Sequence, residues 1–148
     1  MPLEGNKAIL RKMIEAFNKR DLTSLDKLIA PDYIDHYHRL RSLKKYKQFG
    51  TVLFRAFPDW HETIEDMIAE GNKVWLRFKA TGTHTGKLEF GKVRLSPTSK
   101  KITAMGVMAY CIVDGRIVEA WGASNLLELY EKLGIIEYTE KAKGTVSK

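Results

Sequence analysis

Residues 57–86 read FPDWHETIEDMIAEGNKVWLRFKATGTHTG, and this stretch decides the fold. Two runs rich in strand-forming residues, 61–70 and 73–83, flank a turn that contains Gly71 and Asn72. Because glycine and asparagine adopt the backbone angles of tight turns, the stretch predicts an antiparallel hairpin. The second run closes on Gly-Thr-His-Thr-Gly, which predicts a tight backbone path and a histidine, His84, that supports the turn.

A second hairpin follows in the last third of the chain. Residues 102–113 and 116–123 have the composition of strands, and the Asp114-Gly115 pair between them is a strong short-range hairpin signal. The segment between the two hairpins, residues 87–100, is polar and contains Pro97, so we expect a loop or a broken strand there. The second half of the chain therefore predicts a mainly antiparallel sheet.

The first part of the chain predicts helices. Apolar residues recur at helical spacing over residues 4–19 and form one apolar stripe. Asp21 is placed to cap a short second helix that Pro31 ends. A short extended piece is expected over residues 33–38.

Two further helices have clear start and stop signals. Ser42 is placed to cap a third helix, which ends before Pro58 because a residue that precedes proline disfavours helical angles. Asn125 is placed to cap a final helix that Gly134 ends. The pattern predicts an α+β protein with one domain over residues 1–136 and a polar, flexible tail over 137–148.

The composition is that of a globular protein. The chain has 148 residues, of which 44% are hydrophobic, enough for one domain with its own core. The single cysteine, Cys111, lies in an apolar run and is interpreted as a buried packing residue without a disulfide partner. The N-terminus does not resemble a signal peptide, and no apolar run reaches the roughly 20 residues of a membrane helix. We therefore expect a cytoplasmic protein with no membrane association.

The formal net charge is +7, and the basic residues gather at 39–47 and 92–101. Such a balance can indicate nucleic-acid or membrane-surface binding. No nucleic-acid motif accompanies the charge, and the nearby aromatic residues are spaced like core residues rather than on a strand that bases could stack on. A solvated basic face is the favoured interpretation, so no nucleic-acid partner is expected.

The strand at 102–113 carries apolar residues on both of its faces. An antiparallel strand with one solvated face normally alternates apolar and polar residues. Helices can cover only one face of so small a sheet, so a second copy of the chain is expected to cover the other. The pattern therefore predicts a homodimer that packs through its sheets.

Glu119 is the first candidate for catalysis. It alternates with Ile117 and Trp121 along its strand, which places the carboxyl beside apolar neighbours. Desolvation favours the protonated form of a carboxyl and suits a general acid or base. The alternative is a structural glutamate that pairs with Arg77 or Lys79 across the sheet.

Asp35, His36 and His38 form a second candidate cluster. The two histidines are spaced as neighbours on one face of an extended strand, which suits a metal pair or a base with its orienting partner. No metal is expected, because a His-x-His pair alone lacks the further protein ligands that zinc sites use. His36 is interpreted as a pocket histidine bonded to substrate or to Glu119, and His38 as a surface residue. Trp60 and Trp121 are candidates to line a cavity for a flat, hydrophobic ligand.

Two hairpins after a helical first third resemble the SnoaL-like polyketide and ester cyclase family of the nuclear transport factor 2-like superfamily. The resemblance covers about residues 6–133. It rests on the segments LDKLIAPDYIDH (25–36), FPD (57–59), IEDMIAEGNKVWLR (64–77), GTHTG (82–86), DGRIVEAW (114–121) and the following Leu126-Leu127. It implies a cone-shaped α+β domain, a homodimer, and an aldol-type ring closure without cofactor or metal. Carried over to this chain, it implies a pocket lined by His36, Trp60, Arg77, Glu119 and Trp121.

This sequence departs from the family pattern in the last strand. Many members of the family read Glu-His-Trp there and carry an aspartate four positions after the tryptophan, where this chain has Ala120 and Asn125. Two hypotheses follow. The first is a cofactor-independent cyclase or isomerase that acts on a hydrophobic carbonyl substrate, with Glu119 as acid or base and His36 assisting. The second is a noncatalytic module that binds a small hydrophobic molecule in the same cavity.

Overall fold

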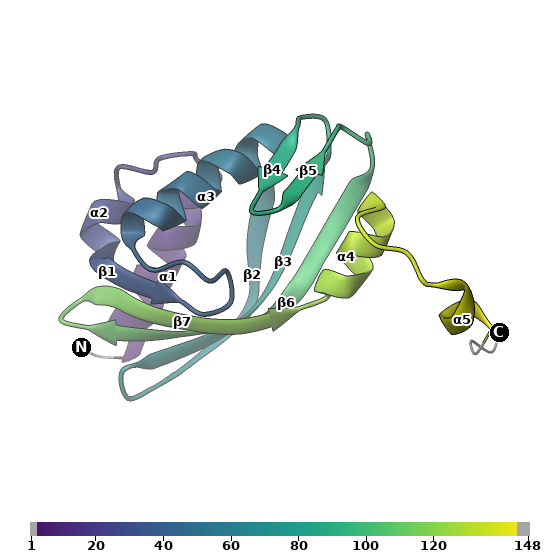
Figure 1. Cartoon of the computed structure of the whole chain (residues 1–148). Coiled ribbons are helices and arrows are strands. Elements are labelled where there is room, and N and C mark those ends of the chain that lie inside the picture. Colours follow the sequence, from purple (N-terminus) through teal and green to yellow (C-terminus); the bar gives the residue numbers. More distant parts are fainter. Residues whose placement is uncertain (1–2, 145–148) are drawn as a thin grey trace.

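A curved five-stranded sheet is the main structural element of the molecule (Figure 1). The computed structural model describes residues 3–144. The strand order is β1-β7-β6-β3-β2, in which β1 runs parallel to β7 and the other neighbours are antiparallel. The strands are β1 (Ile29–Asp35), β2 (His61–Glu70), β3 (Lys73–Thr83), β6 (Lys101–Val113) and β7 (Arg116–Ser124). The predicted, mainly antiparallel sheet is confirmed.

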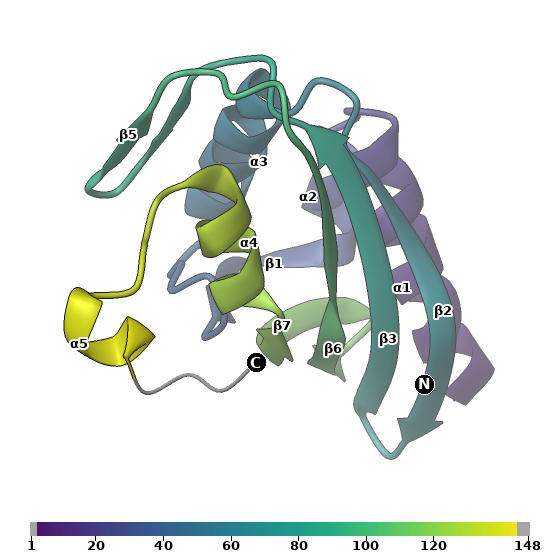
Figure 2. The same cartoon turned by 90° about the vertical axis from the view of Figure 1, so that its right-hand side faces the viewer.

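Helices cover one face of this sheet, which we call the inner face. Figures 1 and 2 show α1, α2 and α3 on this face and α4 beside β6. The helices are α1 (Leu3–Asn18), α2 (Leu25–Leu28), α3 (Leu43–Ala56), α4 (Leu126–Leu133) and α5 (Glu140–Lys143). The core lies between these helices and the sheet, where Leu10, Met13 and Phe17 of α1 are buried together with Val74 and Leu76 of β3. The predicted α+β class is confirmed.

Both predicted hairpins are present with their expected turns. Glu70 pairs with Lys73 across a turn in which Gly71 has φ +59°. In the second hairpin Asp114 and Gly115 have φ values of +51° and +77°. Positive φ at both central residues matches the right-handed twist of the flanking strands, which is why this residue pair predicts hairpins well.

The ends of α3 and α4 follow the predicted signals at three of four positions. The Ser42 hydroxyl accepts a hydrogen bond from the Lys45 amide at 3.0 Å at the start of α3, and α3 ends two residues before Pro58. Gly134 ends α4 with φ +77°. The prediction for Asn125 is wrong, because its side chain makes no cap bond and instead accepts from the Met105 amide and donates to the Thr103 carbonyl, both in β6.

Two segments differ from the prediction. The second helix has only four residues, and its cap position is Ser24 rather than Asp21. Pro31, predicted to end that helix, lies inside β1, where it is tolerated because β1 is an edge strand. The region predicted as irregular contains a small hairpin, β4 (Leu88–Phe90) and β5 (Val93–Leu95), around Gly91 with φ +58°.

No described helix covers the other face of the sheet, which we call the outer face. Apolar side chains that are 39–65% exposed lie on it: Ile68, Trp75, Met105, Val107 and Trp121. The expectation that β6 is apolar on both faces is therefore confirmed. Cys111 is half-buried on the outer face and not in the core, because it pairs with Glu119 in register.

The C-terminal tail leaves the body of the protein after α4 (Figure 1). It contains one helical turn, α5, which the Thr139 hydroxyl caps by accepting a hydrogen bond from the Ala142 amide at 3.2 Å. The last residues of the predicted flexible tail, 145–148, lie outside the described residues. Across residues 3–144, no helix combines the length and the hydropathy needed to cross a membrane.

Candidate functional site

A cavity of about 580 Å³ lies between the helices and the inner face of the sheet. Most of its wall is apolar and comes from α1, α3, β3 and β6, with Phe17, Phe49, Phe78 and Met108 among the lining residues. The hairpin β4–β5 and helix α4 complete the wall. The polar groups on the wall are few: Tyr37, His38, Arg39, Tyr46, Trp60, Glu62, Tyr110 and Tyr130. An apolar cavity with a few converging polar groups is the usual form of a small-molecule site.

One tight turn after β1 supplies three of these polar residues. Asp35 and Leu40 close the turn, since each donates its amide to the carbonyl of the other, at 2.8 and 3.0 Å. The His36 amide donates to the Ala120 carbonyl at 2.9 Å and fastens the turn to β7. The Tyr37 hydroxyl bonds the Ser124 hydroxyl at the end of the same strand. The turn is therefore held at both ends.

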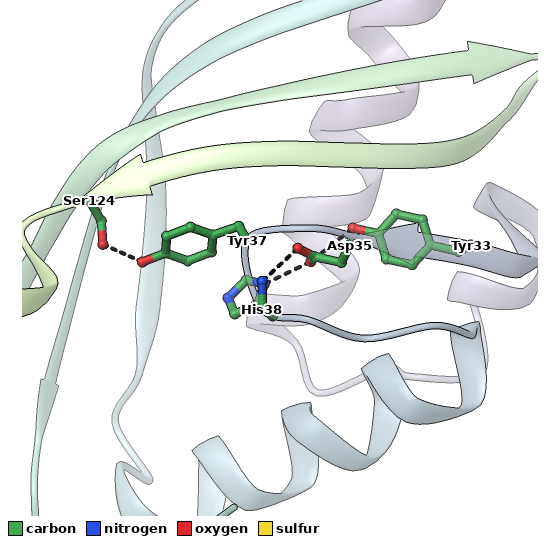
Figure 3. A network of polar contacts seen from close by, with 5 residues as sticks. All are labelled: Tyr33, Asp35, Tyr37, His38 and Ser124. Atoms are coloured by element: carbon green, nitrogen blue, oxygen red, sulfur yellow. Dashed lines mark hydrogen bonds and ion pairs between the residues drawn. The ribbon is translucent and has the colours of Figure 1, made fainter.

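Within this turn, Asp35 is bonded to His38 (Figure 3), and His38 lines the cavity. The Asp35 carboxylate accepts a hydrogen bond from the His38 amide at 2.9 Å, and its other oxygen lies 2.7 Å from His38 Nδ1. The Tyr33 hydroxyl donates to the same carboxylate at 3.1 Å. Asp35 is 1% exposed, whereas the His38 side chain is 26% exposed. The carboxylate is thus buried behind the imidazole, as in an orienting pair.

Opposing effects act on the pKa of Asp35. Burial raises the pKa of this carboxyl, but hydrogen bonds and charge interaction with His38, together with the Tyr33 bond, outweigh burial and hold the pKa below its usual range. An ionised Asp35 accepts the Nδ1 proton of His38, which fixes the tautomer and leaves Nε2 of the neutral ring as a proton acceptor. Nε2 has no hydrogen-bond partner among the described residues.

Glu62 is the carboxyl on the cavity wall. Trp60 Nε1 donates to its Oε2 at 2.9 Å. The side-chain amide of Asn18 brackets the Glu62 backbone, because it donates to the carbonyl and accepts from the amide, both at 2.8 Å. Burial raises the pKa of Glu62 despite the Trp60 bond and the charges of His38, His61 and Arg20. A protonated carboxyl in an apolar cavity can donate a hydrogen bond to a ligand oxygen.

Two tyrosines belong to the same polar cluster. Burial raises the pKa of Tyr46 and Tyr110 well above the ordinary value, and the charges of Glu62 and Asp35 act in the same direction on both. The His38 ring lies 6.5 Å from the Tyr46 ring. Both hydroxyls therefore stay neutral and are available as hydrogen-bond donors inside the cavity.

The sequence comparison decides the family. Residues 7–133 match the model of the SnoaL-like polyketide cyclase family. The chain belongs to this family. No curated protein sequence matches the chain.

Solved structures agree with this SnoaL-like assignment. AclR from Streptomyces galilaeus is 28% identical with a TM-score of 0.78, over 98% of this chain and 95% of its own. IdmH from Streptomyces antibioticus is 29% identical with a TM-score of 0.73, over 87% and 98% of the two chains. TsrD from Streptomyces laurentii is 19% identical with a TM-score of 0.80, over 92% and 99%. The predicted nuclear transport factor 2-like fold is confirmed.

The SnoaL-like cavity contains only Trp60 of the five residues predicted to line one pocket. His36, Glu119 and Trp121 lie together on the outer face. His36 Nε2 is 2.6 Å from Glu119 Oε2, as predicted, and the His36 ring stacks on Trp121 with 5.2 Å between ring centroids. Arg77 also lies on the outer face, where its guanidinium donates to Glu65 at 2.9 Å rather than to Glu119. Their role in catalysis stays a prediction.

A β-bulge explains the placement of Glu119. Ile112 pairs with Ile117, but Cys111 pairs with Glu119, so Val118 is an extra residue in β7. The bulge breaks the alternation along β7, so Ile117 is fully buried on the inner face while Glu119 and Trp121 point outward. The expectation that Ile117 and Glu119 share a face is therefore wrong.

The expectation for His38 as a surface residue is also wrong, because the chain turns sharply after Asp35. Predicted alternation along an extended piece put His36 and His38 on one face, but β1 ends at Asp35 and the turn separates the two rings. Sequence reasoning missed Glu62 as well. Its signal was available, since Glu62 alternates with Ile64 and Ile64 packs against the core.

His84 supports its turn, as predicted. It is fully buried, its Nδ1 accepts a hydrogen bond from the Thr98 amide at 3.2 Å, and its carbonyl accepts from the Ser99 amide at 2.8 Å. Burial lowers the pKa of His84, against the influence of the Gly86 backbone. Among the described residues, no group of three or more histidine, cysteine or acidic side chains is placed to hold a metal ion.

Proposed function

We propose that this protein is a cofactor-independent cyclase or isomerase that acts on a small, hydrophobic carbonyl compound by general acid–base catalysis. The observation that carries the proposal is the pairing, in one apolar cavity, of a histidine oriented by a buried carboxylate with a carboxyl whose pKa burial raises. Titratable groups with shifted pKa values that gather at one cavity, here Glu62 and the Asp35 partner of His38, are typical of functional sites.

The roles of the two groups follow from the Asp35 contact of His38 and from the burial of Glu62. His38 Nε2 takes a proton from the carbon next to a substrate carbonyl, and Asp35 stabilises the imidazolium that forms. Glu62 donates its proton to the carbonyl oxygen, which gives the enol. In an isomerase, the imidazolium returns the proton to another carbon of the conjugated system, while the Glu62 carboxylate takes back the enol proton and the carbonyl re-forms. In a cyclase, the enol carbon attacks a second carbonyl carbon of the same molecule, and the oxygen of that second carbonyl takes the proton from His38. The Glu62 carboxylate again takes back the enol proton as the first carbonyl re-forms.

The family membership supports this reaction type. Structurally similar IdmH is described as a proposed polyketide cyclase, and AclR as a proposed hydroxylase. One fold can carry several reactions, so the residues in the cavity decide which reaction is proposed. The second candidate function is noncatalytic binding of a small hydrophobic molecule, which the predominantly apolar wall favours.

Proton exchange separates the two functions and compares the two candidate sites. The test follows exchange of the α-protons of β-tetralone, an apolar ketone, for deuterium in D₂O by mass spectrometry. We expect the protein to accelerate exchange, and His38→Gln and Glu62→Gln to reduce the acceleration by roughly 10²–10⁴-fold. His36→Gln and Glu119→Gln change the other candidate pair. Loss of exchange only in those two variants would move the proposed site to the outer face.

A binding assay with the same ketone distinguishes the noncatalytic alternative. Binding without any acceleration of exchange supports the binding module and contradicts the catalytic proposal. Glutamine at either position preserves hydrogen-bonding capacity and much of the side-chain volume, so these variants test proton transfer rather than cavity shape.

The proposal includes a homodimer that packs through the outer face. A row of side chains crosses this face in register, from Ile68 to Trp75, Ala109 and Trp121. Ala109 lies between the two tryptophans, and because its side chain is small, the tryptophans form one apolar surface. Trp75 is 51% exposed and Trp121 is 39% exposed. Large exposed apolar patches mark interaction sites, and a second copy of the same sheet presents a matching surface.

A further inference from the structure

The cavity wall has more positive than negative charge. Among the described residues on the wall, the ionisable groups other than tyrosine are His38, Arg39 and Glu62. Burial favours the neutral form of Glu62. Arg39 is always protonated, so the permanent charge on the wall is positive.

The side chain of Arg39 is unpaired among residues 3–144. In the part of the chain that the structure describes, its guanidinium makes no hydrogen bond and no ion pair. Arg39 is exposed and yet lines the cavity, which places it at the rim. Its backbone has φ +60°, a conformation that costs an arginine more than a glycine. The turn thus holds a free guanidinium at the cavity opening.

The carboxylates near the cavity are engaged elsewhere. Asp35 is bonded to His38 and Tyr33, behind the wall. The charges that act on Glu62 come from His38, His61 and Arg20, not from Arg39. Neither of these two carboxyl groups is bonded to Arg39, so its guanidinium is available to an acidic group on a ligand.

The hairpin β4–β5 adds positive charge beside the same opening. Its side chains Leu88, Phe90 and Val93 line the cavity, and Phe90 contacts Phe49 of α3 with 5.3 Å between ring centroids. Residues 87–95, which are the hairpin and the residue before it, contain three basic side chains and one acidic one: Lys87, Lys92, Arg94 and Glu89. Glu89 forms an ion pair with Lys87 at 3.4 Å, which leaves the hairpin net positive.

We infer that the ligand of this cavity is an amphipathic acid, with its apolar body inside and a carboxylate bound by Arg39 at the rim. The inference rests on the proposed function and adds the charge of the substrate. A planar guanidinium can bind a carboxylate through two parallel hydrogen bonds, which gives orientation as well as affinity. Bound in this way, the acid group holds the carbonyl segment in the part of the cavity that contains His38 and Glu62.

The test compares two fluorescent probes that differ only in charge: dansylaminoundecanoic acid and its methyl ester. Titrations monitor the rise in dansyl fluorescence on transfer into an apolar site. We expect the acid to bind the wild-type protein about tenfold more tightly than the ester, as a charge-assisted hydrogen bond at a partly exposed site provides. Arg39→Met should remove this preference and leave the affinity for the ester unchanged.

Two further variants distinguish binding by the Arg39 guanidinium from a nonspecific effect of the net positive charge. Arg41→Met removes the same charge from an exposed position that does not line the cavity, so the preference for the acid should persist. Arg39→Lys keeps the charge but not the planar fork, and should retain only part of the preference. Equal loss in the Arg39→Met and Arg41→Met variants would assign the effect to net charge and contradict the inference.

The outcomes distinguish this inference from the proposed function. Equal affinity of the wild-type protein for acid and ester overturns the anionic substrate but leaves the acid–base cavity in place. A preference for the acid in a protein that fails to exchange β-tetralone protons supports the inference and contradicts catalysis. If neither probe binds, both the anionic ligand and the cavity as a ligand site are wrong.

Discussion

His36 and His38 lie two residues apart, and their imidazoles lie on opposite faces of the sheet. The His36 ring contacts Glu119 and Trp121 on the outer face. The His38 ring contacts Asp35 and Phe49 and lines the cavity, with 4.5 Å between its centroid and that of Phe49. One turn therefore separates two imidazole–carboxylate pairs. The His36–Glu119 pair faces outward, and the His38–Asp35 pair faces the interior.

Glu62→Gln should change how stability depends on pH. The pKa of Glu62 is raised in the folded protein, so this group stabilises the fold fully below its unfolded value of about 4.3, and the contribution is lost as pH rises through the folded pKa. The free energy of unfolding of wild type minus that of Glu62→Gln should therefore fall as pH rises above about 4.3. Urea unfolding at a series of pH values measures this difference.

The control for that experiment is Glu70→Gln, which changes an exposed glutamate at the end of the same strand. Its difference from wild type should not fall with pH in this way. A flat difference for Glu62→Gln would show that Glu62 is ionised in the folded protein at no cost, and would remove it as a proton donor.

Asp35→Asn should destabilise the protein at neutral pH by about 2–3 kcal/mol, because the buried carboxylate serves three donor groups. The folded pKa of Asp35 is depressed, so its stabilising contribution is present above the unfolded value of about 3.9 and is lost as pH falls through the folded pKa. The difference from wild type should shrink in acid. Asp32→Asn, at an exposed position of β1, is the matched control.

Glu119→Gln should leave the stability of the single chain almost unchanged. The side chains of His36 and Glu119 are 44% and 34% exposed, and an ion pair at this level of exposure contributes about 1 kcal/mol or less. Thermal unfolding of the variant measures the effect. A loss of several kcal/mol would instead indicate that the pair becomes buried, as in the proposed dimer, and dilution of the protein would then change the unfolding midpoint.

The proposed dimer predicts a mass of twice the 17.0 kDa chain by light scattering at micromolar concentration. Trp75→Lys places a charge in the middle of the apolar row and should give monomers that remain folded, because the tryptophan side chain is half-exposed in one chain. Thr63→Lys, at an exposed position of β2, should remain dimeric. A wild-type protein that is monomeric at this concentration contradicts the proposal.

Local signals predicted most of the fold. The Gly71 and Gly115 turns, the Ser42 cap and the Gly134 end each depend on the conformational preference of one or two residues, so the sequence contains them directly. Pro31 misled the prediction because its effect depends on position in the sheet: it is excluded from a central strand but tolerated at the edge.

The site was harder to predict, because its residues depend on two interruptions of regular alternation. The turn closed by Asp35 and Leu40 separates His38 from His36, and the bulge at Val118 separates Glu119 from Ile117. Neither interruption contains a glycine or a proline that would indicate it. The alternation rule placed residues on the correct face up to each interruption and on the wrong face beyond it.

The bulge at Val118 gives a numbering rule to anyone who redesigns β7. The inward-facing position before it, Ile117, is odd, and the inward-facing position after it, Ala120, is even. Deleting Val118 would remove the extra residue and leave Ile117, Glu119 and Ala120 in regular alternation, with both halves of the strand on their present faces. A combinatorial library that keeps Val118 should therefore vary the positions on each side of it as two separate frames.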